Sequence, residues 1–242
     1  DFENKSHTFS YLFASSHLYE RANKTAEEIK RTGALSGISA HHLLVADKIA
    51  QLFASLGTGR EKTVVILSPN HFSLGRSSIQ MTDGTWTTPL GDVEVDTKAL
   101  ANIQTIDPDL SYEPETFERE HGVSAIVPFV KRWFPQARII PIVLHEKATS
   151  DQIKQLAQAI QQTVPKAIVV ASMDMSHQQP KEIQLLHDEA TMTVIQDGEC
   201  QGDCSLDVDA NRVLETLFEI NRLRDTQAWT LTHHGSSMMM GA

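Results

Sequence analysis

Five segments that are typical of buried β-strands each run into a histidine. The segments are Leu35–Ala40, Thr63–Ser68, Arg138–Leu144, Ala167–Ser172 and Ala228–Thr232, and the histidines are His41 and His42, His71, His145, His177, and His233 and His234. In an open α/β sheet the carboxyl ends of the strands share one edge, where ligands bind. Imidazole binds metals and transfers protons near neutral pH. The pattern predicts a functional site at this edge, whereas polar loops at strand ends are the alternative explanation for each histidine alone.

The alternation of strands and helices predicts the fold class. A continuous apolar run such as Thr63–Ser68 is typical of a strand covered on both faces by helices. Helices are expected at Tyr19–Arg31, Leu43–Leu56, Glu120–Phe134, Asp151–Val164, Lys181–Asp197 and Asp209–Leu223. We therefore expect an α/β protein: a single three-layer α/β/α domain over residues 1–242, with a mostly parallel central sheet and residues 1–34 as an N-terminal helical lead-in.

Local signals refine this expectation. Asp83-Gly84 is a hairpin signal, which predicts a flap or a small antiparallel pair within residues 72–96. Pro141 has no N–H to donate, so its strand is expected at an edge of the sheet or at a bulge. Asp151 is expected to cap the helix that it begins. Pro128 is expected to kink or divide the helix in which it lies.

The composition limits the possible partners. The formal net charge is −10, and no basic cluster is longer than two residues, so a nucleic-acid partner is not expected. No apolar run approaches the roughly 20 residues that span a bilayer, so membrane insertion by this chain is not expected. The chain begins at Asp1 rather than Met, which we interpret as the loss of an upstream segment. A soluble domain, either cytoplasmic or exported, fits these observations.

Three short strings carry possible chemistry. In Ser172–His177, the carboxylate of Asp174 is close enough in sequence to orient the imidazole of His177, although it is also a candidate helix cap. Glu120-His121 heads a predicted helix, where capping alone would explain the glutamate. Asp207 and Asp209 precede the last long helix, and each is a candidate cap or a hard oxygen ligand.

Other chemistries have less support. The two cysteines, Cys200 and Cys204, are four residues apart and could form a local disulfide, supply one thiolate to a metal, or do neither. The chain has no glycine-rich dinucleotide motif, phosphate-binding loop, serine-hydrolase elbow or His-Glu-x-x-His helix. A nucleotide-dependent enzyme and a serine hydrolase are therefore not expected.

Four strings together resemble the Memo-like family, whose bacterial and archaeal members are called AmmeMemoRadiSam system protein B. They are Ser68–His71, Trp86–Asp92, Glu120–Val123 and Ser172–His177, and their order and spacing match over about residues 37–231. The resemblance implies a fold shared with class III extradiol ring-cleaving dioxygenases. It also implies a metal site in the crevice, which family members fill with iron or copper.

The same resemblance implies a set of ligands. Ala40–Leu44 stands where the family has Pro-His-Ala-Gly-Tyr, which makes His41 the first expected ligand, and His71 is the second. A family cysteine before the last long helix corresponds to Asp207, with Cys204 as the rival. Because the Ala-Gly-Tyr part is not matched, the resemblance does not carry a substrate over to this chain.

These residues lead to a first functional hypothesis and two alternatives. Two histidines and one carboxylate are the facial set of non-haem Fe(II) oxygenases, so we expect a dioxygenase-like redox enzyme with Fe(II), or else Cu or Zn. Asp174, His177 and His121 are its expected catalytic residues, with His177 moving a proton. One alternative is a non-catalytic module that binds a small molecule or a peptide in the crevice. The other is a closed structural zinc site with four protein ligands.

Overall fold

The computed structural model describes residues 7–11, 16–176, 179–199 and 206–226 of the 242-residue chain. Its main sheet has the strand order β2-β8-β3-β7-β4-β6. These strands are β2 (Ser36–Ser39), β3 (Thr63–Pro69), β4 (Ile79–Met81), β6 (Leu110–Tyr112), β7 (Arg138–Leu144) and β8 (Ile168–Ser172). The first four in spatial order are parallel, β4 is antiparallel to β7, and β6 is parallel to β4. The predicted mostly parallel central sheet is confirmed.

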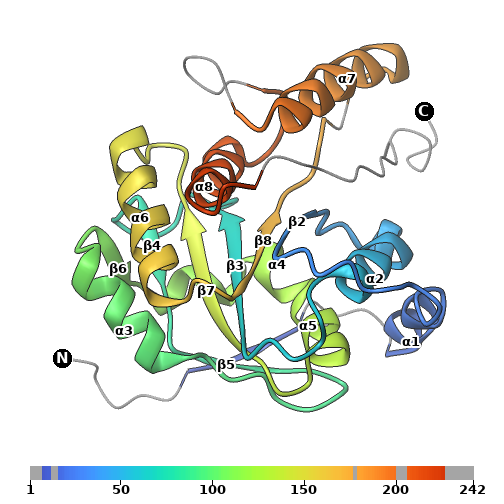
Figure 1. The fold of residues 1–242 in the computed structure, drawn as a ribbon, viewed down its shortest axis with the longest axis horizontal. Coiled ribbons are helices and arrows are strands. Elements are labelled where there is room, and N and C mark those ends of the chain that lie inside the picture. Colours follow the sequence, from blue (N-terminus) through green and yellow to red (C-terminus); the bar gives the residue numbers. More distant parts are fainter. Residues whose placement is uncertain (1–6, 12–15, 177–178, 200–205, 227–242) are drawn as a thin grey trace.

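Helices flank this sheet and complete the three-layer α/β/α fold (Figure 1). They are α1 (Ser16–Lys24), α2 (Ala46–Ser55), α3 (Thr97–Ile106), α4 (His121–Ser124), α5 (Val127–Trp133), α6 (Ser150–Thr163), α7 (Lys181–Asp197) and α8 (Asn211–Leu223), with 3-10 turns at Leu43–Val45 and Pro114–Glu118. α6 packs against α3 and α8, whereas α2 packs against α1 and α5. α7 lies beyond the sheet, away from these two groups. In the described part of the chain, no helix is both long and apolar enough to cross a membrane.

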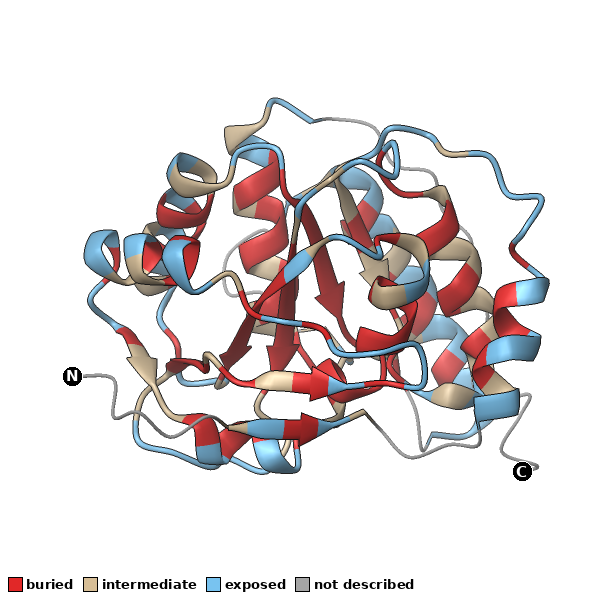
Figure 2. Ribbon diagram, turned by 90° about the horizontal axis from the view of Figure 1, so that it is seen from below, coloured by how far each residue is buried: buried red, intermediate tan, exposed pale blue. Residues whose placement is uncertain are grey.

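The core lies between the sheet and its helices. β8 is buried throughout, and β3 and β7 are buried after their first residues. These strands are rich in Val and Ile, which pack well on a pleated surface that is covered on both sides. Figure 2 shows the buried residues concentrated in the central strands and on the helix surfaces that face them. This rigid centre fixes the positions of the loops that follow the strands.

Residues 72–96 contain an antiparallel bridge, between Trp86 and Val93, which fits the predicted small pair, but the turn at Asp83-Gly84 does not make the predicted hairpin. The strands on its two sides, β4 and β5 (Thr85–Thr87), belong to different sheets: β4 joins the main sheet, and β5 pairs in parallel with β1 (Thr8–Ser10). Phe9 of β1 packs on Trp86 with ring centroids 4.6 Å apart. A Cβ at Gly84 would overlap the Phe9 ring, so this close approach requires glycine. Packing on the N-terminal strand thus prevails over the local hairpin signal.

Pro141 lies inside the sheet, which corrects the prediction of an edge or a bulge. β7 is paired with β3 on one side and with β4 on the other. The N–H of Ile139 donates to the carbonyl of Glu94, away from β3, and alternation along the strand turns the Pro141 nitrogen to the same side. On this side of β7, Ile139 pairs with Val95, and β4 pairs only from Ile142 onward. The Pro141 nitrogen faces the gap between these two pairings. The missing donor therefore faces this gap rather than a paired residue of β4.

Helix boundaries give one confirmation and two corrections. Pro128 divides its helix as predicted, because α4 ends at Ser124 and α5 begins at Val127. The cap of α6 is Thr149 rather than Asp151, in a capping box with Gln152. α8 begins at Asn211, two residues later than predicted, so Asp209 lies outside the helix. The predicted strand Ala228–Thr232 and the histidines after it fall outside the described residues.

Asp107 is a buried carboxyl group at the end of α3. The residue is fully buried, its Oδ1 accepts from the Asp109 N–H at 3.1 Å, and its Oδ2 has no hydrogen-bond partner among the described residues. Burial raises the pKa of Asp107 from 3.8 to about 6. The native state therefore disfavours the ionised form more than the unfolded state does.

We predict that Asp107→Asn changes the pH dependence of stability. Because the pKa of Asp107 is raised in the folded state, ionisation of this carboxyl group reduces the folding stability. The reduction is absent below pH 3.8, grows as the pH rises to about 6, and stays constant above that pH. The free energy of unfolding of the variant should therefore rise, relative to that of the wild type, between pH 4 and pH 8. This rise should be up to about 3 kcal/mol, at 1.36 kcal/mol per pKa unit. Urea unfolding at both pH values measures this. An equal difference at both would contradict the prediction.

Candidate metal centre

Three parallel strands bring polar residues together at their carboxyl ends. His41 follows β2, His71 follows β3, and Asp174 follows β8. The backbone N–H of His41 donates to Asp174 Oδ1 at 3.2 Å, which ties two of these loops together. His121, the first residue of α4, adds a third imidazole. The predicted convergence of His41 and His71 is confirmed.

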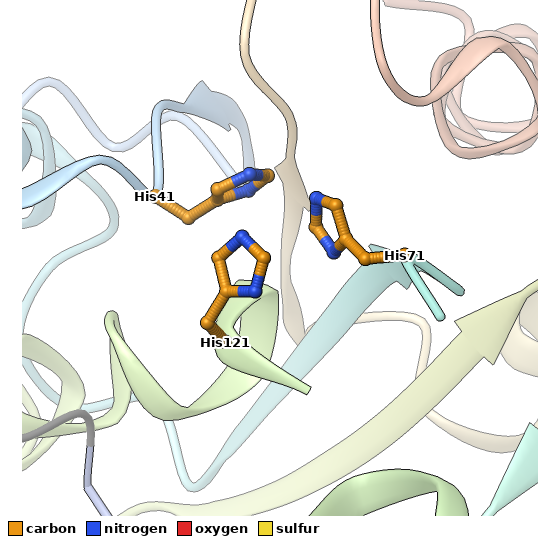
Figure 3. Close-up of side chains that lie close together, drawn as sticks. All are labelled: His41, His71 and His121. Carbon is orange, nitrogen blue, oxygen red and sulfur yellow. The ribbon is translucent and has the colours of Figure 1, made fainter. Parts of the chain in front are cut away.

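The three imidazoles face one another across a small space (Figure 3). Their ring centroids are 4.8 Å apart for His41 and His71, 5.1 Å for His41 and His121, and 3.9 Å for His71 and His121. The His41 ring meets the other two edge-on, whereas His71 and His121 are stacked with an interplanar angle of 30°. His41 is 2% exposed, so the cluster is closed on its side.

Two other strand-end histidines lie elsewhere. The His42 side chain accepts from the Leu44 N–H and caps the 3-10 turn that follows. His145 Nδ1 accepts from the Lys147 N–H in the loop after β7. These two side chains therefore accept hydrogen bonds within their own loops, as the alternative explanation of polar strand-end loops predicts.

Asp209 supplies a carboxylate to the cluster. Its Oδ2 lies 3.0 Å from His41 Nε2 and 3.3 Å from His71 Nε2. Its Oδ1 accepts the backbone N–H of Asp174 at 2.9 Å, which fixes the segment before α8 against the end of β8. Asp174 Oδ2 lies 3.6 Å from His41 Nε2. Two sets of potential ligand atoms within 4.8 Å of one another result: His41, His71 and His121, and His41, Asp174 and Asp209.

Asp207, the third ligand expected from the sequence, does not lie in this cluster. Asp207 is exposed, and its Oδ2 lies 2.6 Å from Nδ1 of His187 on α7. Asp209, two residues later, lies between the two imidazoles instead. The sequence identified both aspartates as possible oxygen ligands, and the register taken from the family resemblance selected the first. His177 and Cys204 fall outside the described residues, so their roles stay predictions.

Glu120 holds His71 in place. Its side chain is 1% exposed, and Oε1 lies 2.6 Å from His71 Nδ1 while Oε2 accepts the His71 backbone N–H at 3.1 Å. Oε1 also accepts the Gly122 N–H at 2.8 Å, which is the capping role expected from the sequence. Its contact with His71 spans 49 positions, and no local pattern signals it.

The surrounding charges divide the histidines into two kinds. Burial lowers the pKa of His71, but hydrogen bonds with Asp209 and Glu120 and the charges of these carboxylates outweigh it and raise the pKa to about 9. Burial, with the charges of His71 and His41, lowers the pKa of His121 to about 4. Burial opposes ionisation of Asp209 and Glu120, but contacts with the histidines lower the pKa of both. At neutral pH the metal-free cluster therefore holds a protonated His71 beside a neutral His121.

We predict that the metal-free protein shows this division directly. In an NMR titration, the His71 ring should titrate near pH 9 and the His121 ring near pH 4. Asp209→Asn should lower the pKa of His71, because it removes a negative charge and an acceptor. The stabilisation from protonated His71 is full below pH 6.5 and is lost as the pH rises through about 9. Titration of both rings near 6.5 would contradict this account.

Comparisons with known proteins find one family along most of the chain. A family model described as Memo-like protein matches residues 19–216. A MEMO1 family protein of Caldivirga maquilingensis is 41% identical over 128 residues, which are 51% of this chain and 45% of the relative. A MEMO1 family protein of Pyrobaculum aerophilum is 33% identical over 168 residues, which are 67% of this chain and 60% of the relative. The chain thus spans about half to three fifths of the length of these curated relatives.

Proposed function

The chain belongs to the Memo-like protein family, and we propose that the cluster at its carboxyl sheet edge is a metal centre for a redox reaction. The observation that carries this proposal is the position of Asp209 Oδ2 between His41 Nε2 and His71 Nε2. Two imidazole nitrogens and one carboxylate oxygen are the facial set of non-haem Fe(II) oxygenases, which leaves other positions open. Fe(II) is therefore the proposed ion, with Cu or Zn as alternatives.

The spacing of these three atoms supports a common ion. Ligand atoms bonded at about 2.1 Å and at right angles to one another are about 3 Å apart. The two distances from Asp209 Oδ2, 3.0 and 3.3 Å, have this size. Each of the two imidazole nitrogens thus lies at a suitable distance from the Asp209 oxygen to share an ion with it.

The stacking of His121 on His71 distinguishes its role from that of a ligand. The lone pairs of an imidazole lie in the plane of the ring, and His121 stacks on the face of His71 with the ring centroids 3.9 Å apart, so we propose that it lies beside the ion without binding it. With a lowered pKa, His121 is neutral at pH 7 and able to accept a proton from a ligand bound beside it. We therefore assign His41, His71 and Asp209 to the ion and His121 to proton transfer.

Asp174 lies at the border of the site and completes its polar wall. Its Oδ1 orients the His41 backbone, and its Oδ2 lies 3.6 Å from His41 Nε2. We propose that this carboxylate orients His177 for proton transfer, as the sequence predicted. A redox-active ion would supply the electron chemistry, and the substrate would be a small molecule in the crevice.

The two neighbouring aspartates provide a matched test of the ligand set. We predict that the wild-type protein retains one equivalent of iron after anaerobic reconstitution and desalting, as measured by elemental analysis. His71→Ala and Asp209→Asn should lose this iron, because each removes a donor atom. Asp207→Asn is the control and should retain it, because Asp207 pairs with His187 instead.

The opposite results have distinct meanings. Loss of iron in Asp207→Asn together with retention in Asp209→Asn would return the third ligand to Asp207. A wild-type protein that retains no iron, copper or zinc would overturn the metal centre.

His121→Gln tests catalysis separately from metal uptake. With catechols as the first probe substrates and ring-cleavage absorbance as the measurement, we predict turnover by the iron-loaded wild type. The variant should retain iron and lose about 10²- to 10⁴-fold in rate, which is the usual contribution of a general base. Iron-loaded wild type without turnover or oxygen consumption would instead favour the binding module, and loss of iron in the variant would make His121 a ligand.

A further inference from the structure

We infer that Ser172 and Glu120 are positioning residues that hold both ligand imidazoles in the same tautomer, with the proton on Nδ1 and the Nε2 lone pair toward the ion. This inference rests on the proposed metal centre and deepens it. It follows from the direction of hydrogen bonds around two buried side chains. Neither residue contacts the ion in this assignment.

Ser172 sets the tautomer of His41. Its hydroxyl donates to the carbonyl of Gly122 at 2.6 Å, and its Oγ lies 3.1 Å from His41 Nδ1. A hydroxyl has one proton, and a carbonyl can only accept. The proton is therefore committed to Gly122, and Ser172 Oγ accepts from His41 Nδ1–H. This leaves Nε2 of His41, which faces Asp209, as the free donor atom.

Glu120 sets the tautomer of His71 in the same sense. Its carboxylate accepts the backbone N–H groups of His71 and Gly122, and burial leaves it 1% exposed. The remaining contact, 2.6 Å from Oε1 to His71 Nδ1, is between an ionised acceptor and a ring nitrogen. His71 Nδ1 therefore carries a proton, and Nε2 faces Asp209 at 3.3 Å. A carboxylate behind a ligand histidine also makes the imidazole a stronger donor.

Gly122 joins the two positioning residues. Its N–H donates to Glu120 and its carbonyl accepts from Ser172, so one residue links the supports of both imidazoles. A Cβ at Gly122 would overlap the hydroxyl of Ser68 at the end of β3. The absence of a side chain thus allows this residue to lie against the strand and reach both supports.

The tautomers can be tested in the Zn²⁺-loaded protein, because without an ion the Asp209 carboxylate itself attracts a proton to each Nε2. Long-range ¹H–¹⁵N NMR spectra of the ¹⁵N-labelled protein loaded with Zn²⁺ show which ring nitrogen of each histidine carries the proton. We expect Nδ1–H for both His41 and His71 in the wild type. Ser172→Ala should disturb the tautomer of His41 alone, and Glu120→Gln that of His71 alone. An Nε2–H form of either ring in the wild type would overturn the inference.

The consequence for binding is tested with Zn²⁺ alone, in competition with a chromophoric chelator. Ser172→Ala and Glu120→Gln should each weaken the affinity 10- to 100-fold, the usual effect of losing a group that orients a ligand. Ser36→Ala is the matched control for the serine, because Ser36 lies at the other end of β2 and its hydroxyl donates to the Asn221 side chain, away from the cluster. Glu113→Gln is the control for the glutamate, because Glu113 accepts from the backbone of Arg76 and Ser77 and from the Gln80 side chain rather than from a histidine of the cluster.

The outcomes separate the two proposals. Unchanged affinity in folded Ser172→Ala and Glu120→Gln would overturn the positioning role and leave the metal centre intact. A wild-type protein that binds no Zn²⁺ would overturn the metal centre, whereas Zn²⁺ binding with the proton on Nε2 of either ring would leave the metal centre intact and overturn the positioning role. Equal weakening in the two control variants would show a general loss of structure and would also overturn the positioning role.

Discussion

The contact of one carboxylate with two imidazoles from different strands is the interaction on which the site depends. Asp209 Oδ2 approaches both His41 and His71, while its Oδ1 is held by the backbone of Asp174. The carboxylates of Asp174 and Asp209 both lie beside His41 Nε2. Carboxylates this close together repel one another unless positive charge lies between them. In the metal-free protein His71 supplies that charge, and a bound ion would take its place. The same negative environment that raises the pKa of His71 thus favours a cation.

The parallel sheet makes this contact geometrically possible. β2, β8 and β3 are neighbours, and their register places Ser39 beside Ser172 and Leu67 beside Ala171. The loops that follow therefore leave the sheet at nearly the same level. Burial of the strands on both faces leaves them little freedom to shift, so the imidazoles are held by the core rather than by the loops.

The sequence was sufficient for the convergence of His41 and His71, because that depends on strand period and parallel order. It was not sufficient for the partners that lie behind them. The contact of Ser172 with His41 spans 131 positions, and only the packed sheet brings these residues together. The sequence could not distinguish Asp207 from Asp209 for a related reason: both precede α8, and only the tertiary contact of Asp209 with the end of β8 separates them. Pro141 was misplaced because a local rule about donors could not anticipate the gap beside β7.

The pairing of the first and last strands of the parallel group has a consequence for biosynthesis. β2 lies beside β8, and His41 is held through Asp174 and Ser172, both of which are made long after it. Contacts between such distant parts of a chain form slowly, because a long loop must close first. A nascent chain that still lacks Asp209 has both imidazoles but not the carboxylate between them. The proposed centre would therefore be completed only after Asp209 has been made, and a product truncated before that residue would lack its carboxylate.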